Sequence, residues 1–328
     1  MVPLSVLDLA PILEGGDAAG AMRRSLDLAR HAERLGYRRF WLAEHHGMTG
    51  IASAATSVLI GHVAQGTSTI RVGAGGVMLP NHSPLVIAEQ YGTLEALYPG
   101  RIDLGVGRAA GTDPKTARAL RLTEAAIDAF PRDVAQLLDW FDATDDDPRR
   151  VRAVPGEGAG VPVWVLGSSL FGAQLAAHLG LPYAFASHFA PAALEAATQI
   201  YRDRFRPSDR LDAPYVMLGV NVFAADSADE ARRLATSLEQ AVLALRSGSP
   251  GRLKPPRDDL ELSPRDRALI AGFMECTFVG DGDTVREQLA AFAERTGADE
   301  LIVASQIFDH DARVKSYELI APAAPPQT

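Results

Sequence analysis

The chain has 328 residues, of which 47% are hydrophobic and 22% are charged, a composition typical of a globular protein that excludes a disordered chain. The formal net charge of −9, from 32 basic and 41 acidic residues, excludes a protein that coats nucleic-acid phosphates. Cys276 is the single cysteine, so an intrachain disulfide and a cysteine-based zinc module are excluded as well. The first residues lack the pattern of a signal peptide, and no apolar run approaches the roughly 20 residues of a membrane span. We therefore expect a cytoplasmic protein without a nucleic-acid or membrane partner.

Short apolar segments alternate with helical patterns along the chain, and the alternation repeats eight times. The segments are rich in Val, Ile, Leu and Phe without a regular polar alternation, which is typical of strands covered on both faces. In the first helical stretch, apolar residues recur at steps of three and four, at Met22, Leu26, Ala29, Ala32 and Leu35, which predicts an amphipathic helix. The predicted strands are residues 4–9, 40–43, 70–74, 102–106, 163–166, 183–186, 216–223 and 300–304.

Eight strand–helix units in roughly 250 residues, with insertions making up the rest, predict an α/β fold of the (β/α)8 TIM-barrel type. A doubly wound sheet also alternates strands and helices, but it usually has a glycine fingerprint after its first strand. Residues 8–11 read Asp-Leu-Ala-Pro instead, so the barrel is favoured. We expect one domain over residues 1–320 and a disordered, Pro-rich tail at 321–328.

Two polar stretches interrupt the alternation. Residues 142–160 are rich in Pro and Gly, which predicts a long surface loop before the fifth strand. Residues 247–264 separate the seventh helix from the last unit. This second stretch is long enough to be a lid over the strand ends, and a solvated surface segment is an equal alternative.

Two histidines follow the second predicted strand, in the sequence Glu44-His45-His46. Consecutive residues that leave a strand point to opposite sides, so the two imidazoles are not expected to bind one metal from the same face. A metal site would need another ligand, for which His188 is a candidate, and a structural role with both rings hydrogen-bonded in a loop is also open. We favour one imidazole acting on a bound substrate or cofactor, because histidine titrates near neutral pH, and we predict no metal.

A glycine pair, Gly75-Gly76, comes just after the third predicted strand. Glycines permit unusual dihedral angles and allow a flat ligand to approach the backbone closely. An ordinary tight turn explains the pair equally well, so the pair alone leaves both interpretations open.

A possible anion site combines Arg108, after the fourth strand, with Ser168 and Ser169, after the fifth. A helix that begins after a Gly-Ser-Ser turn offers free backbone N–H groups and the positive end of its dipole, and a guanidinium would add charge-assisted hydrogen bonds. Serine is also a common N-cap, and Arg108 has Asp103 and Asp113 as alternative partners. These residues therefore indicate a phosphate site without excluding the structural roles.

In this order, the motifs resemble those of the luciferase-like flavin monooxygenase family, from the first strand to about residue 305. The similar stretches are WLAEHH at 41–46, IRVGAGGVMLPNH at 70–82, PGRIDLGVGR at 99–108, LGSS at 166–169, GLPYAFASHF at 180–189 and GADELI at 297–302.

The resemblance implies a TIM barrel that binds reduced FMN at the strand ends and uses O2 on a small organic substrate. It also implies a separate flavin reductase as partner and a homodimer. The same fold with a deazaflavin coenzyme, which transfers hydride without oxygen, and a flavin-binding protein without turnover are the alternatives.

The resemblance also assigns residues. His45 matches the catalytic histidine of the family, with His46 beside it. Gly75 and Gly76 match a pair joined by a non-proline cis peptide under the flavin ring. The implied phosphate site consists of Arg108, Ser168, Ser169 and the backbone around Gly172. One departure is Ala110, where relatives of this subgroup usually have proline, so we expect a less rigid loop there.

Overall fold

A computed structural model describes residues 1–109, 113–142 and 149–322 of the chain. The departure at Ala110, residues 143–148 of the predicted 142–160 loop and residues 323–328 of the predicted tail lie outside these residues. No helix in the described ranges combines the length and the apolar character needed to cross a membrane.

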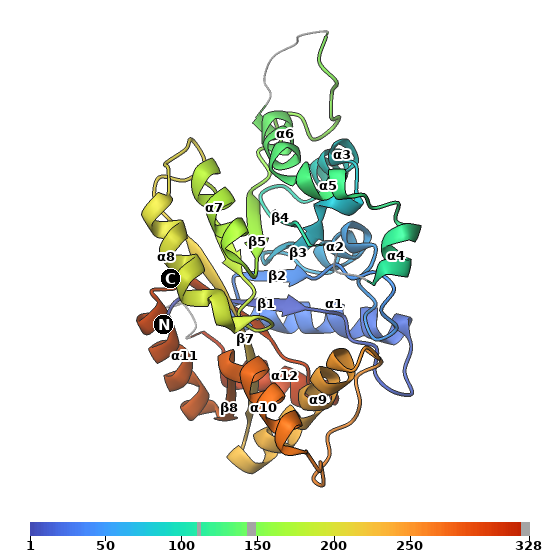
Figure 1. The fold of residues 1–328 in the computed structure, drawn as a ribbon, viewed down its shortest axis with the longest axis vertical. Helices are drawn as coiled ribbons and strands as arrows, with labels where there is room; N and C mark the ends of the chain where they lie inside the picture. Colours follow the sequence, from blue (N-terminus) through green and yellow to red (C-terminus); the bar gives the residue numbers. More distant parts are fainter. Residues whose placement is uncertain (110–112, 143–148, 323–328) are drawn as a thin grey trace.

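The strands of the described residues form one parallel sheet in which eight strands close into a barrel (Figure 1). Going round the barrel, the order is β1-β2-β3-β4-β5-β6-β7-β9, and β9 pairs with β1 to close it. The barrel strands are β1 (Leu4–Asp8), β2 (Arg39–Leu42), β3 (Arg71–Met78), β4 (Ile102–Gly107), β5 (Val163–Gly167), β6 (Tyr183–Phe185), β7 (Val216–Ala225) and β9 (Glu300–Ala304). They coincide with the eight strands predicted from the sequence, and the TIM barrel is confirmed.

One strand, β8 (Thr277–Asp281), was not predicted. It pairs with the second half of β7, from Asn221 to Ala225, beyond the point where β6 pairs with the first half. Four of its five residues are only partly buried, so β8 lacks the continuous apolar pattern that marks the barrel strands. It extends the sheet outside the barrel.

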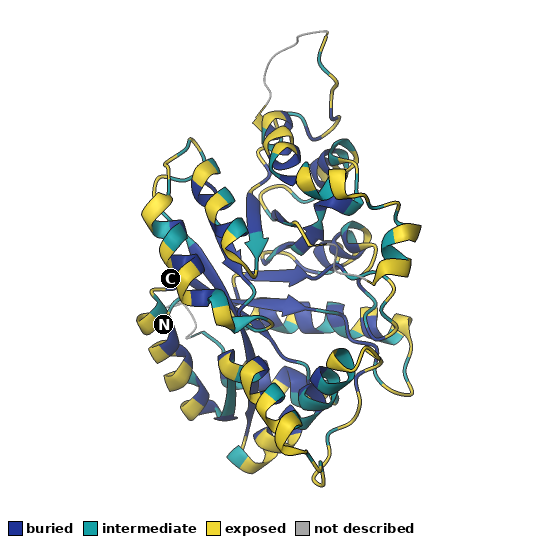
Figure 2. Cartoon of the chain, in the orientation of Figure 1, coloured by how far each residue is buried: buried dark blue, intermediate teal, exposed yellow. Residues whose placement is uncertain are grey.

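Most helices cover the barrel and have one buried and one exposed face (Figure 2), whereas α4 (Pro114–Ala119) and α5 (Glu124–Asp128) have no buried residue. Several begin at a side-chain cap, as predicted for Asp and Ser at this position: Asp17 accepts from the Gly20 N–H of the first helix at 2.7 Å. The helices are α1 (Ala18–Arg34), α2 (Thr56–Gln65), α3 (Pro84–Leu97), α4 (Pro114–Ala119), α5 (Glu124–Asp128), α6 (Phe130–Asp142), α7 (Leu170–Leu179), α8 (Leu194–Arg204), α9 (Ala228–Arg246), α10 (Pro264–Phe273), α11 (Gly282–Thr296) and α12 (His310–Leu319). Short 3-10 turns, η1 (Leu79–Asn81), η2 (Pro191–Ala193) and η3 (Met274–Cys276), complete them.

A buried charge network occupies the barrel interior near the amino ends of the strands. Arg39 donates to Asp103 at 2.7 Å and to Glu300 at 3.0 Å, and all three side chains are at most 6% exposed. Trp41 donates to the same Asp103 carboxylate at 3.1 Å. Because each buried charge has an opposite partner, the network is tolerated in the interior. It closes this end of the barrel and leaves the carboxyl ends as the place for a site.

A second hydrophobic core lies outside the barrel. It joins the end of β7 to α9 and α10, and its members include Phe223, Leu238, Val242, Ile270 and Phe273. In Figure 1, α9 and α10 lie together beside β8. The same face of α9 borders the cavity described below.

Candidate active site

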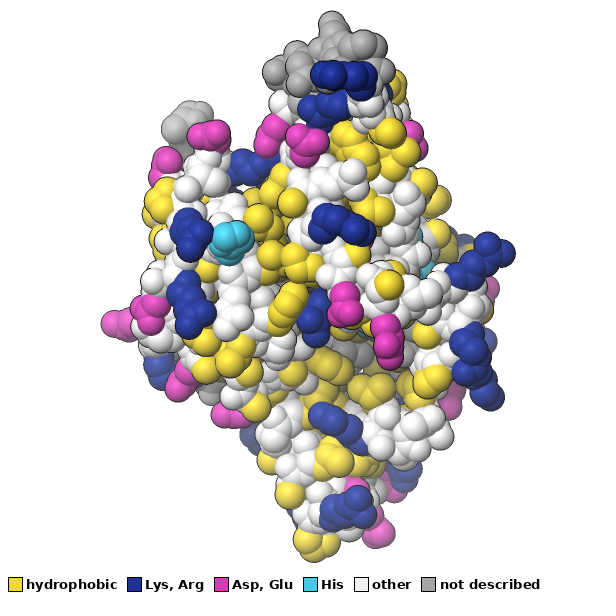
Figure 3. Space-filling view, turned by 45° about the horizontal axis from the view of Figure 1, so that its top comes forward, with side chains coloured by type: hydrophobic (Ala, Val, Ile, Leu, Met, Phe, Trp, Pro, Cys, Tyr) yellow, Lys and Arg dark blue, Asp and Glu magenta, His cyan; other side chains and the backbone are white. Residues whose placement is uncertain are grey.

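The residues predicted to be functional gather at the carboxyl ends of the barrel strands. Since all barrel strands are parallel and the sheet is closed, the segments that follow β2, β4, β5 and β6 meet at one mouth, where TIM-barrel chemistry is normally found. Figure 3 shows hydrophobic side chains gathered near the middle of one face of the molecule, between charged side chains.

A buried carboxylate holds His46 at this mouth. Glu44 is 2% exposed, and its Oε1 accepts hydrogen bonds from the Nε2 atoms of His46 and His82, both at 2.8 Å. His82 follows η1, which follows β3. These three side chains are also a group, within the residues that the structure describes, that can hold a metal ion, since their ligand atoms all lie within 4.8 Å of one another. The two hydrogen bonds satisfy the Glu44 oxygen without one, and the absence of a metal stays a prediction.

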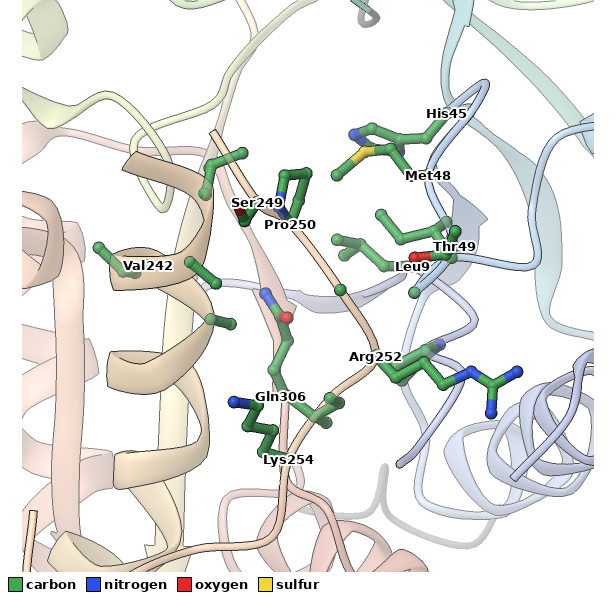
Figure 4. Close-up of a pocket in the computed structure, with 18 of the residues that line it drawn as sticks. Leu9, His45, Met48, Thr49, Val242, Ser249, Pro250, Arg252, Lys254 and Gln306 are labelled. Atoms are coloured by element: carbon green, nitrogen blue, oxygen red, sulfur yellow. The ribbon is translucent and has the colours of Figure 1, made fainter. Parts of the chain in front are cut away.

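His45 lines the same cavity as His46 but takes no part in the Glu44 cluster. Its backbone N–H donates to the Ser53 carbonyl at 3.0 Å, and its ring borders this cavity (Figure 4). Burial lowers the pKa of His45 below its usual value, so the ring is favoured in the neutral form that can accept a proton. Its Nδ1 is buried and has no hydrogen-bond partner within the described ranges.

His188, which the sequence suggested only as a metal ligand, lies close to His45. Burial is the main cause that lowers the pKa of His188 to about 4, and the neighbouring His45 is a smaller cause. Its Nδ1 is likewise buried without a hydrogen-bond partner among the described residues. The structure therefore brings together two neutral imidazoles, and His188 is separate from the Glu44, His46 and His82 cluster.

The glycine pair lies within β3 and not after it, which corrects the predicted strand boundary. The sheet register between β3 and β4 shifts between Ala74 and Val77, and this irregularity broke the strand pattern in the sequence. The Gly75–Gly76 peptide bond is cis, as the resemblance implies. A Cβ atom would lie 2.7 Å from the Leu7 side chain at residue 75 and 2.8 Å from the carbonyl oxygen of Gly105 at residue 76. Only glycine fits these two positions without a shift of its neighbours.

Arg108 and the two serines form a common surface at the start of α7. The Arg108 guanidinium carbon lies 4.1 Å from the centre of the Phe171 ring in the first turn of α7, a cation–π contact that holds it beside the helix N-terminus. Ser169 is the N-cap, but its side chain makes no capping hydrogen bond, and both Ser168 and Ser169 are exposed. Asp103, an alternative partner of Arg108, is bound instead by Arg39 and Arg71.

Gly172 lies in the first turn of α7, where a side chain would make ordinary van der Waals contacts. A Cβ atom on residue 172 would lie 3.4 Å from the Cα of Gly167 and equally close to the Leu166 carbonyl. The start of α7 thus offers free N–H groups, two hydroxyls and one adjacent guanidinium, which are the groups that bind phosphate at helix N-termini. These donors can bind the phosphate group of a flavin or a deazaflavin coenzyme.

A cavity of about 840 Å³ adjoins His45 and His46. Its wall is largely apolar and comes from the ends of β1 and β2, from α9 and from the predicted 247–264 segment (Figure 4). Leu253 anchors this segment: its N–H donates to the Ile12 carbonyl at 3.0 Å, and its carbonyl accepts from the Glu14 N–H at 2.8 Å. Residues 248–254 therefore cover the cavity, as predicted for a lid, and their movement stays a prediction.

Comparison with known proteins identifies the family. The model of the luciferase-like monooxygenases matches residues 2–300. The chain belongs to this family. A luciferase-like monooxygenase of Escherichia coli strain K12 is 57% identical over 97% of this chain and 96% of its own length. The protein in the crystal structure of apo-MsnO8 is 38% identical to this chain in sequence. The two structures have a TM-score of 0.85, and the match covers 98% of each chain.

More distant luciferase-like structures share the fold. An FMN complex of the oxygenating constituent of 3,6-diketocamphane monooxygenase from Pseudomonas putida has a TM-score of 0.73 at 18% identity, and the match covers 99% of this chain and 98% of that one. An F420-dependent secondary alcohol dehydrogenase, bound to an F420–acetone adduct, has a TM-score of 0.65 at 15% identity, with 97% of both chains covered.

Two contacts at this site were missed in the sequence, that of His82 with Glu44 and that of His188 with His45. His82 and His188 are both inside motifs that carried the resemblance, but their spacing from Glu44 and His45 gives no local signal. His82 is 38 residues from its partner Glu44. A polar residue shortly after a barrel strand was the available clue, and it applied to both.

Proposed function

We propose that the chain is an FMN-dependent monooxygenase that uses reduced flavin and O2 on a small, mainly apolar organic substrate. The observation that supports it best is the juxtaposition at one barrel mouth of the Arg108–Phe171 contact at the start of α7 with the neutral His45 beside an apolar cavity. When bound, reduced FMN supplies two electrons to O2, so that one oxygen atom enters the substrate and the other leaves as water.

The residues of the chain have separate tasks in this proposal. Arg108, Ser168 and Ser169 bind the phosphate, and the Gly75–Gly76 backbone lets the flat ring approach β3. His45, neutral because burial lowers its pKa, accepts or returns a proton during turnover. The lid and the apolar wall exclude water from the reacting groups.

A deazaflavin-dependent hydride transfer is the second candidate, because both coenzymes carry a phosphate group and an F420-dependent enzyme shares the fold. The test is oxygen uptake by the purified protein mixed with chemically reduced FMN or reduced deazaflavin, over a panel of aldehydes, ketones and thioethers. We expect FMN to support oxygen-dependent loss of one panel member. Substrate turnover with deazaflavin alone would instead support the second candidate, and flavin binding with no turnover on any substrate would support a flavin-binding protein.

We propose two partners for this activity. A flavin reductase supplies reduced FMN, so NADH and FMN without a reductase should give no turnover. A second copy of the chain forms a homodimer, so light scattering should give twice the chain mass of 35.0 kDa.

A further inference from the structure

The segment that follows β9 places a glutamine at the cavity. Gln306 lines the cavity and is half-buried. Figure 4 shows its side-chain amide directed into the space between α9 and the lid. Within residues 1–109, 113–142 and 149–322, this amide has no hydrogen-bond partner. Its N–H groups and its oxygen are therefore available to a molecule that occupies the cavity.

The backbone around Gln306 is fixed by its neighbours. Ser305 is 1% exposed, and its hydroxyl donates to a carbonyl of β7 at 2.9 Å, while its own carbonyl accepts from Arg313 Nε at 2.7 Å. Arg313 is paired in turn with the buried Asp8 carboxylate, at the end of β1, at 2.8 Å. On the other side of Gln306, Ile307 is buried in the second hydrophobic core. The amide is thus presented from a rigid strand end, which suits a residue that selects a ligand.

A second glutamine at the cavity has a structural task. Gln240, on α9, donates its side-chain N–H groups to the carbonyls of Thr236 and Pro255, at 3.2 and 2.9 Å. It thereby ties α9 to the chain that follows the lid. The other α9 residues that line the cavity are apolar: Leu238, Ala241, Val242, Ala244 and Leu245. Of the polar side chains that α9 and the end of β9 place around the cavity, that of Gln306 is the one without a partner among the described residues.

The chemistry of an amide determines what it can bind. A side-chain amide offers two N–H donors and one acceptor oxygen, and it carries no charge. A molecule that fills the cavity displaces water from this amide, and it loses affinity unless it replaces the hydrogen bonds. A carboxamide or a lactam pairs with the N–H groups and the oxygen at once, whereas a ketone pairs with the N–H groups alone. Arg252 and Lys254 also line the cavity, but both are exposed residues of the lid, where an ion pair stabilises a complex only slightly.

We propose that Gln306 is a specificity-determining residue, which selects mainly apolar substrates that carry an uncharged carboxamide-type group. The inference rests on the proposed function for the identity of the cavity as the substrate site. In Figure 4, the amide is seen away from His45, beyond the apolar side chains of Leu9 and Met48. The polar group of the substrate therefore binds at Gln306, and a different part of the molecule faces His45.

The test uses hexanamide and pentyl methyl ketone, two probes of the same shape that differ by an amino group in place of a methyl group. Affinities are measured by ligand-observed NMR on the FMN-loaded protein and on the free chain, without turnover. Gln306→Met keeps the length of the side chain and removes its hydrogen bonds. It should lower the affinity for hexanamide about 2- to 12-fold more than the affinity for the ketone, which corresponds to one neutral hydrogen bond. Equal losses for the two probes would overturn the proposal.

Two further variants assign the effect to the amide. Gln306→Glu keeps an acceptor and loses the donors, so at about pH 8, where it is ionised, it should retain the preference for hexanamide over the ketone. Gln288→Met, at an exposed position of α11, is the matched control and should behave as wild type. Loss of the preference in the control as well would show that Gln306 is not its source.

Other results would assign the preference elsewhere and contradict the proposal. If Gln240→Met removes it and Gln306→Met does not, the α9 amide binds the probe. If hexanoate binds more tightly than hexanamide and Lys254→Met abolishes the difference, the cavity selects an anion through the lid. A failure of the proposed function would be seen separately, as a lack of FMN binding or of oxygen uptake in a protein whose probe preference is intact.

Discussion

The buried, neutral state of His188 predicts a specific dependence of stability on pH. The pKa of this side chain is about 4 in the folded protein against an ordinary value of 6.5. Above pH 6.5 the ring is neutral in both the folded and the unfolded protein, so it adds nothing to the pH dependence of stability there. As the pH falls below it, the unfolded chain takes up a proton that the folded chain does not accept until about pH 4, so the free energy of unfolding decreases.

The size of the effect follows from the two pKa values. Their separation corresponds to about 3 kcal/mol when complete, and roughly 1.4 kcal/mol of it is lost between about pH 7.5 and about pH 5.5. Urea unfolding of wild type and His188→Asn at both pH values isolates this contribution, because the other titrating groups are common to both proteins. Between the two pH values, the free energy of unfolding of wild type should fall by about 1.4 kcal/mol more than that of His188→Asn. Parallel losses of stability would show that His188 is not held neutral by burial.

Three further predictions concern the site. Arg108→Ala should weaken FMN binding about 10- to 150-fold in a fluorescence titration, since one charge-assisted contact is lost; riboflavin affinity should stay unchanged, and unaltered FMN affinity would remove Arg108 from the phosphate site. His45→Ala should lower turnover by about 10²- to 10⁴-fold with little change in FMN affinity, and near wild-type turnover would exclude a role of His45 in proton transfer. His46→Ala should instead lower the melting temperature, because Glu44 loses one of its two imidazole partners. Trypsin should cut the 247–264 segment after Arg252 and Arg257 more slowly in the presence of saturating FMN if this segment closes over the bound flavin, and equal rates would make it a passive loop.

The barrel could be predicted because each of its strands is buried on both faces and stands out as an apolar segment. The same reasoning failed for β8, which is half exposed, and at β3, where the register shift hid the last four residues of the strand. For α1 the helix and part of its buried face were predicted, since Ala29 and Ala32 are fully buried. The start of that face was not: Ser25 is fully buried and donates to the Ala21 carbonyl, while Met22 is 36% exposed. A hydroxyl that bonds within its own helix can be buried at little cost, and apolar periodicity does not detect this.

At the site, the sequence indicated which strand ends carry polar residues but not which of them meet. The positions of His45, Arg108 and the serines follow from parallel strands in a closed barrel. The contact between Glu44 and His82 depends on the path of η1, and the orientation of His188 depends on the absence of a side chain at residue 219. Such pairings arise from the folded backbone, and no local pattern in the chain encodes them.

The cavity has walls that belong to two different hydrophobic cores. Leu9, which lines the cavity, packs against the apolar layer inside the barrel, in which Leu7 and Trp41 lie against Gly75. Leu238 and Phe273, on the far side of the cavity, belong to the separate core of α9 and α10. A change of size or shape in that outer core can therefore redraw the space offered to a substrate while the support of the glycine pair keeps its packing. A scaffold divided in this way can diversify towards new molecules by altering one helical layer, while the barrel interior around Gly75 and Gly76 is left as it was.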